Sequence, residues 1–167
     1  MLNRIILLVV LIFALVGCNR SLDVQPNGDG TSTITVGLTE SEINTVITTA
    51  LNTAENPLLS NPSVDLQTGQ IVVSGDYQRQ DGSGTASGTI TLQVSVANGE
   101  IQAQVTNVNV EGWDASDERI QQFNQRLETA LATVAQQNNA NASLDRITIT
   151  NDMLDISITI QTPQFGN

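Results

Sequence analysis

The residue types that carry most enzyme chemistry are scarce in this 167-residue chain. It has no histidine and no lysine, and Cys18 is its one cysteine. Nucleophile–base pairs normally use histidine, cysteine or lysine, so the sequence predicts a protein that is not an enzyme. A carboxylate pair for glycoside cleavage among the 17 acidic residues is an alternative, but no spacing singles one out. We expect no cofactor and no metal, because histidine ligands and thiolate clusters are missing.

Cys18 is the residue whose surroundings indicate a specific reaction. Arg4 precedes an apolar run, residues 5–16, which is shorter than the roughly 20 residues of a transmembrane helix. The run ends in Leu15-Val16-Gly17-Cys18, which resembles a bacterial lipobox. That resemblance implies recognition of Leu15, Val16 and Gly17 by signal peptidase II and transfer of a diacylglyceryl group to Cys18. An ordinary secretory signal with an incidental cysteine is the alternative.

Charge limits the partners of the processed chain. Removing residues 1–17 takes away Arg4, which leaves five arginines against 17 acidic residues and a net charge of −12. Such a body repels nucleic acid and anionic headgroups, so we expect no nucleic-acid binding and attachment to the membrane through acylated Cys18. The expected location is the extracytoplasmic side of the cell envelope. In a cell with two membranes this means the outer membrane or periplasm, because Asn19 stands where a retention aspartate would.

The remaining chain divides into a tether, one domain and a tail. Residues 18–32, which include Asn27-Gly28-Asp29-Gly30, have a composition that predicts a flexible tether. A calcium loop is a weaker interpretation of that segment, because the spaced carboxylates and closing glutamate are missing. Residues 33–162 are long enough for a single domain with its own core, and 163–167 form a short tail.

The strongest structural pattern is a β-hairpin over Thr85 to Val110. Its first arm alternates apolar and polar side chains, as a half-buried strand does. Asn98-Gly99 favours a tight type I′ turn, which pairs Val96, Val94 and Leu92 with Ile101, Ala103 and Val105. The apolar phase changes after Val105, and this change predicts a β-bulge near Thr106-Asn107 that bends the sheet.

Two amphipathic helices are expected beside this hairpin. Thr39-Glu40-Ser41-Glu42 has the form of a capping box and opens an apolar stripe from Ile43 to Ala54. The second helix begins near Asp117, with Asp114 or Ser116 as its cap. A metal or acid–base role for its first acidic residues is the weaker interpretation, because the helix dipole explains their position. Trp113 is expected to close the end of the core or to stand at a pocket mouth.

These pieces predict an α+β fold. A short strand over 33–36, strand pairs over 64–80 and 85–110, and a last hairpin over 147–160 alternate like antiparallel strands. In that last hairpin Ile149 is expected opposite Leu154 and Ile147 opposite Ile156. The expected architecture is a curved antiparallel sheet, built as a meander, with both helices packed on its apolar face.

The same combination resembles a known family. The lipobox, the Leu38-Thr39-Glu40-Ser41-Glu42-Ile43-Asn44 helix start, the Asn98-Gly99 hairpin and the final helix and β-pair are similar to YceB-like bacterial lipoproteins. These are similar to the tubular lipid-binding (TULIP-like) superfamily, with LmeA-type phospholipid-binding proteins as related alternatives. The resemblance implies a curled sheet that wraps a helix around an apolar cavity, and a bound phospholipid or fatty acid. It implies no catalytic residues.

Two functions follow as expectations. The first is a membrane-anchored lipoprotein that binds or carries an acyl ligand between sheet and helices. The expected cavity is lined by Val46, Ile47, Leu51, Ile90, Leu92, Val94, Ala103, Val105, Phe123, Leu127, Leu131, Ile149 and Ile156. The second is a structural or interaction lipoprotein with a solid core, whose polar strand face meets an unidentified protein or glycan partner. That face carries Thr89, Thr91, Gln93, Gln102 and Gln104.

Overall fold

The computed structural model describes residues 22–52, 57–136 and 143–161. Along the chain the elements are β1 (Leu22–Pro26), β2 (Thr31–Thr39), α2 (Glu40–Asn52), β3 (Ser60–Gln67), β4 (Gln70–Gln78), β5 (Thr85–Ala97), β6 (Glu100–Asn109), α3 (Glu118–Gln136), β7 (Ser143–Ile149) and β8 (Met153–Gln161). The expected α+β class is confirmed.

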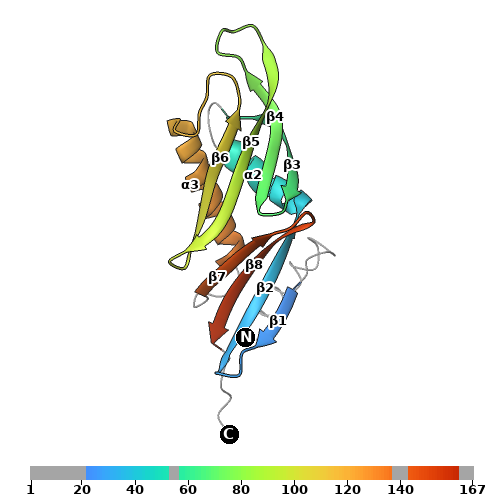
Figure 1. Ribbon diagram of the computed structural model, residues 1–167, viewed down its shortest axis with the longest axis vertical. Helices are drawn as coiled ribbons and strands as arrows, with labels where there is room; N and C mark the ends of the chain where they lie inside the picture. The colour runs from blue at the N-terminus through green and yellow to red at the C-terminus, as the bar shows by residue number, and fades with distance from the viewer. Residues whose placement is uncertain (1–21, 53–56, 137–142, 162–167) are drawn as a thin grey trace, which may run out of the picture.

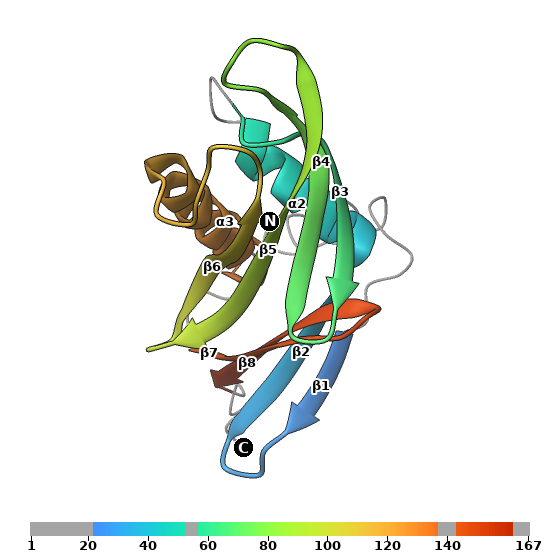
Figure 2. The same ribbon diagram turned by 45° about the horizontal axis from the view of Figure 1, so that its top comes forward.

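The strands form two four-stranded antiparallel sheets, where the sequence predicted one curved sheet. The central sheet has the order β3-β4-β5-β6, and the terminal sheet has the order β1-β2-β8-β7. The prediction of a single meander was wrong because β2 pairs with β8, near the other end of the chain, and not with a strand of the β3–β6 meander. With β1 on β2 and β7 on β8, these four strands form a second sheet. Figures 1 and 2 show the two sheets at opposite ends of an elongated molecule.

The hairpins themselves agree with the sequence prediction. Val96, Val94 and Leu92 lie opposite Ile101, Ala103 and Val105. The turn residues Asn98 and Gly99 have φ values of 54° and 78°, as a type I′ turn requires. Thr91 pairs with Asn107 while Leu92 pairs with Val105, so Thr106 is the extra residue of the expected bulge. In the terminal sheet the pairs Ile149–Leu154 and Ile147–Ile156 also form as expected.

Residues 22–32, which the sequence assigned to the tether, form structure instead. Strand β1 pairs with β2 from Leu22 opposite Val36 to Pro26 opposite Ser32. Asp29 accepts hydrogen bonds from the backbone N–H and the hydroxyl of Thr31, so it shapes the β1–β2 turn. These bonds lower the pKa of Asp29. The polar, glycine-rich composition that suggested a linker is therefore the composition of a hairpin turn.

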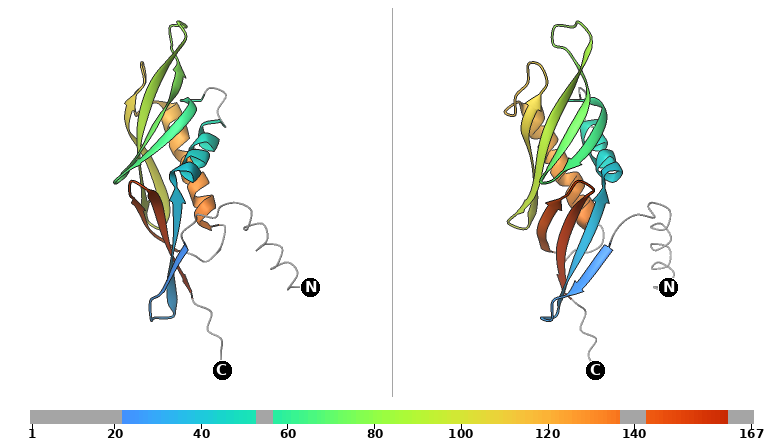
Figure 3. Two further views of the ribbon diagram at one scale, coloured as in Figure 1. Left: turned by 90° about the vertical axis from the view of Figure 1, so that its right-hand side faces the viewer. Right: turned by 45° about the vertical axis from the view of Figure 1, so that its right-hand side comes forward.

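Both helices lie on the same side of the central sheet (Figure 3). The predicted capping box of α2 is formed: the Thr39 N–H and hydroxyl both donate to Glu42 Oε2 at 3.0 Å. Helix α2 packs against β3 and α3, and α3 packs against β6. One continuous hydrophobic core joins these helices to both sheets.

Helix side chains also cover both edges of the central sheet. At one edge the Leu66 N–H of β3 donates to Glu40 Oε2 at 3.1 Å. At the other edge the Val105 N–H of β6 donates to Asn124 Oδ1 at 3.2 Å, and the Ala103 N–H donates to Glu128 Oε1 at 2.9 Å. Exposed edge N–H groups are a template for pairing with other chains, and these contacts occupy three of them.

Candidate functional site

A groove runs between α2 and α3 on the side of the helix pair that faces solvent. Its volume is about 460 Å³. Helix α2 contributes Thr49 and Ala50, and α3 contributes Gln122, Gln125, Arg126, Thr129 and Ala130. Alanine at positions 50 and 130 keeps the groove open, because a longer side chain at either place would enter it. The lining is mostly apolar carbon, with polar groups from glutamine, threonine and one arginine.

Arg126 is the one cation that lines this groove. Its side chain is partly buried, and in the part of the chain that the structure describes no carboxylate forms an ion pair with it. Among the described residues, Arg79 and Arg119 form ion pairs, whereas Arg126 and Arg146 do not, and Arg146 is exposed. A planar guanidinium binds carboxylate or phosphate oxygens through paired N–H groups.

The groove continues inward and toward the central sheet. A small pocket of about 20 Å³ shares Ala50, Gln122 and Arg126 with the groove and adds Leu51, Leu58 and Phe123. A third pocket, of about 190 Å³, shares Leu58 and Arg119 with the small one and reaches Tyr77 and Trp113. Arg119 and Arg126 are seven residues apart on α3, which is close to two helical turns, so both face this line of pockets.

Trp113 and Arg119 form the far end of this line. The guanidinium carbon of Arg119 lies 3.3 Å from the centroid of the Trp113 ring, which is a cation–π contact. Trp113 packs against the core and also lines the third pocket, so both expected roles apply to it. Its buried Nε1 has no hydrogen-bond partner among the described residues.

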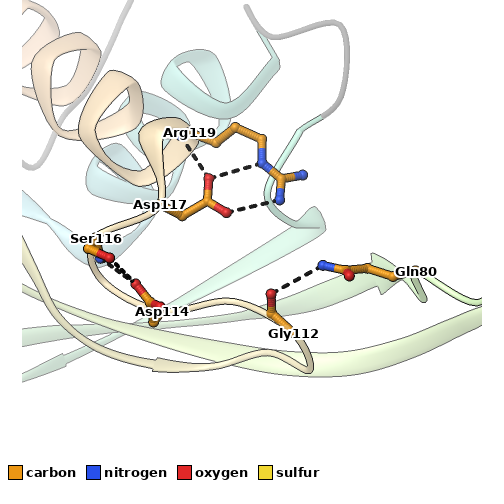
Figure 4. A network of polar contacts seen from close by, with 6 residues as sticks. All are labelled: Gln80, Gly112, Asp114, Ser116, Asp117 and Arg119. Carbon is orange, nitrogen blue, oxygen red and sulfur yellow. Dashed lines mark hydrogen bonds and ion pairs between the residues drawn. The ribbon is translucent and has the colours of Figure 1, made fainter.

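Asp117 sets the start of α3 and the direction of Arg119 (Figure 4). The Arg119 backbone N–H donates to Asp117 Oδ1 at 2.9 Å, and its guanidinium donates to both carboxylate oxygens at 3.2 Å. These bonds hold the pKa of Asp117 below its ordinary value. The helix cap is therefore Asp117, and the prediction of Asp114 or Ser116 was wrong.

Asp114 shapes the preceding corner instead of capping α3. It accepts hydrogen bonds from the Ser116 hydroxyl and backbone N–H, which lower its pKa. The Gly112 carbonyl accepts a bond from Gln80 Nε2 at 3.1 Å and ties the corner to the end of β4 (Figure 4). The described residues include no group of three metal-ligating side chains.

A separate and more polar pocket of about 360 Å³ lies beside β6. Its lining includes Gln102, Gln104, Gln121 and the edge-covering residues Asn124 and Glu128. Asn124 Oδ1 and Glu128 Oε1 accept backbone N–H groups of β6, so this pocket borders the contact that holds α3 to the sheet edge.

The predicted cavity residues lie in the shared core. All are buried except Val46, which is partly buried and packs against the others. Leu51 and Phe123 line the inward extension of the groove, and Ala103 and Val105 line the pocket beside β6. The remaining members belong to the core cluster: Val46, Ile47, Ile90, Leu92, Val94, Leu127, Leu131, Ile149 and Ile156. There is no free space at Gly88 in β5, because a Cβ there would lie 2.8 Å from Val110 Cγ2 and 2.9 Å from the Asn109 carbonyl oxygen.

The sequence analysis did not predict the groove. It used the apolar stripes of the two helices, and these are the faces that α2 and α3 turn to the core. The available signal was the placement of Arg119 and Arg126 on one side of α3 in a chain with only six basic residues. Ala50 and Ala130 gave no signal by themselves, because alanine is common in any helix.

The expected lipidation site, Leu15 to Cys18, and the expected tail, 163–167, lie outside the described residues. No helix among the described residues has both the length and the apolar character needed to cross a bilayer.

Comparisons of the chain with protein-family models, with curated proteins and with solved structures found no match.

Proposed function

We propose that this protein is an extracytoplasmic lipoprotein that binds a fatty acyl or phospholipid ligand in the groove between α2 and α3. The observation that carries the proposal is the groove itself: about 460 Å³, with a mostly apolar lining and Arg126 as its one cation. Ligand pockets for small molecules typically span about 300–1,000 Å³ and combine an apolar wall with few polar groups. A carboxylate or phosphate headgroup suits the guanidinium, and a hydrocarbon chain suits the wall.

The lipobox supports the membrane location. Acylation of Cys18 after cleavage behind Gly17 would hold the domain at the extracytoplasmic face of a membrane, beside a source of lipid. The resemblance to tubular lipid-binding proteins is part of this proposal, and the bulge at Thr106 that bends β6 is consistent with it. The ligand site nevertheless lies along the helix pair and not between helices and sheet.

A groove-filling variant tests the proposal. In Ala130→Trp the indole occupies the groove, so uptake of palmitate and of phosphatidylglycerol should fall at least about tenfold, equivalent to about 1.4 kcal/mol. Gln121→Trp is the matched control, because Gln121 is on the same helix but borders the separate pocket beside β6. Equal uptake by the two variants, with both folded, would refute binding in the groove.

The outer face of the central sheet supports a second candidate, an interaction lipoprotein. Gln93 lies opposite Gln104, and Ser95 lies opposite Gln102, on the face turned away from the core. Gln93, Gln102 and Gln104 are exposed, whereas Thr89 and Thr91 are partly buried by their neighbours. A folded wild-type protein that takes up neither lipid would favour this second candidate, with a glycan or protein bound through amide and hydroxyl groups.

A further inference from the structure

One face of the terminal sheet is apolar in three successive rows, and the next row on that face holds Pro26, Ser32 and Ile160. The rows of directly opposite residues are Leu22, Val36, Ile156 and Ile147, then Val24, Ile34, Ile158 and Leu144, then Leu38, Leu154 and Ile149. The row with Leu38 lies deepest in the core, and its three side chains are buried. In the first two rows the most exposed side chain is the one on the edge strand β1.

Leu22 and Val24 are the exposed end of this apolar face. Their exposed fractions are 65% and 51%, and they are the large apolar side chains that stand out as exposed among the described residues. Ile34 beside Val24, and Ile147 further along the first row, are partly exposed. The opposite face of β1 presents Asp23 and Gln25. The strand is therefore amphipathic, with its apolar side turned to solvent in the isolated chain.

The length of chain before β1 limits what can cover this face. Leu22 is four positions after Cys18, so the two lie within about 14 Å even when that segment is fully extended. If Cys18 is acylated, its lipid chains are in the bilayer and its backbone is at the headgroups. Leu22 then lies within reach of the interfacial layer, which is several ångströms deep on each side of the hydrocarbon core, and Val24 follows two positions further along β1.

We propose that the apolar face of β1, at Leu22 and Val24, docks on the outer surface of the bilayer as a second membrane contact. This inference rests on the proposed acylation of Cys18. Acyl anchoring is strengthened by a second, weak contact, and apolar side chains at the interface supply one. The domain is thereby held with its terminal sheet toward the membrane, while α2 and α3 pack on the other sheet (Figures 1 and 3).

A bilayer is a better occupant than a second copy of this chain. After processing, the body has a net charge of −12, so two copies repel each other. Anionic headgroups repel the body for the same reason. A zwitterionic surface of phosphatidylethanolamine or phosphatidylcholine carries no net charge and accepts apolar side chains. The contact is therefore expected on zwitterionic membranes and to be insensitive to salt.

Paired spin labels on the two faces of β1 test the inference. Full-length acylated protein is reconstituted in phosphatidylethanolamine–phosphatidylcholine vesicles, with Val24→Cys labelled in one sample and Gln25→Cys in the other. These residues are neighbours on an edge strand and face opposite ways. Accessibility to oxygen, which partitions into the bilayer, is compared with accessibility to a water-soluble nickel complex, and the mass of the N-terminal peptide reports acylation.

We expect the label at position 24 to favour oxygen and the label at position 25 to favour the nickel complex. Two labels that behave alike in an acylated protein overturn the membrane contact and leave the proposed anchor intact. A peptide mass with Cys18 unmodified overturns both the anchor and the contact.

Discussion

At the residue scale, Arg126 carries most of the chemistry that the groove offers. It is partly buried between two helices and has no ion-pair partner among the described residues, whereas Arg119 is engaged by Asp117 and Trp113. A guanidinium held away from carboxylates keeps its N–H groups available for an incoming anion. The ligand is thus expected to place its charged end at Arg126 and its hydrocarbon along Ala50 and Ala130.

Arg126→Gln tests this placement. Losing one charge-assisted contact at a partly exposed site should weaken palmitate binding about tenfold, which corresponds to about 1.4 kcal/mol. Arg79→Gln is the control: it removes the same charge, but Arg79 forms a weak exposed pair with Glu111 at 3.9 Å, away from the groove. Isothermal titration at two salt concentrations measures both variants. Equal weakening in the two would mean that net charge matters and the position of Arg126 does not.

Asp117 provides a second test at this scale, because it caps α3. Asp117→Ala should lower the free energy of unfolding by about 1 kcal/mol at pH 7, through the lost cap. Asp152→Ala, an exposed change in the β7–β8 turn, should have little effect. Urea unfolding of the three proteins provides the comparison.

The pH dependence of that difference follows from the direction of the pKa shift. Hydrogen bonds from Arg119 lower the pKa of Asp117 in the folded protein, so its carboxylate stabilises the fold fully above the ordinary carboxyl pKa near 4. This contribution is lost as the pH falls through the lower folded value. The difference in free energy of unfolding between wild type and Asp117→Ala should therefore narrow below about pH 4. A constant gap down to pH 2 would contradict the capping role.

At the element scale, α3 has three distinct sides. One side buries Ile120, Phe123, Leu127 and Leu131 in the core, and a second covers the edge of β6 with Asn124 and Glu128. The third lines the groove with Gln122, Arg126 and Ala130. The first two sides fix the rotation of the helix and therefore the direction of the third.

Asn124→Leu tests the edge contact. Asn124 is 8% exposed, and its Oδ1 accepts the Val105 N–H, so leucine should leave that buried donor unpaired. The cost should be about 1–3 kcal/mol of unfolding free energy, with faster hydrogen exchange at the Val105 amide. Gln121→Leu, an exposed change one turn away, serves as the control. If Asn124→Leu is destabilised but hydrogen exchange at the Val105 amide is unchanged, the lost stability comes from altered packing and not from the hydrogen bond.

Sequence patterns predicted the local pairing well because local pairing depends on neighbouring residues. Alternation and Asn98-Gly99 fixed the register of the β5–β6 hairpin, and the change of phase after Val105 located the bulge at Thr106. Thr39 and Glu42 likewise predicted the capping box of α2. Each of these features depends on residues that are near each other in the chain.

The features that were missed depend on contacts between distant segments. The pairing of β2 with β8 joins residues more than 110 positions apart, and no local pattern specifies it. Strand β1 has the composition of a linker, and it is ordered by the β2 edge that it meets. The groove depends on how far apart α2 and α3 lie, and this distance is decided by the packing of both helices on other elements.

At the scale of the whole molecule, the two proposed lipid contacts belong to different parts of the fold. The apolar face of β1 belongs to the terminal sheet next to the expected anchor, and the groove belongs to the helix pair on the central sheet (Figure 3). The continuous core between them makes relative movement of the two sheets costly.

Photo-crosslinking tests the central proposal most directly. Purified protein is incubated with a palmitate analogue that carries a diazirine along its chain, irradiated, digested and sequenced by mass spectrometry. We expect adducts on the peptides that contain Thr49–Ala50 and Gln122–Ala130, with competition by unlabelled palmitate and loss in Ala130→Trp. Adducts confined to other peptides, or none that palmitate displaces, would contradict lipid binding between α2 and α3.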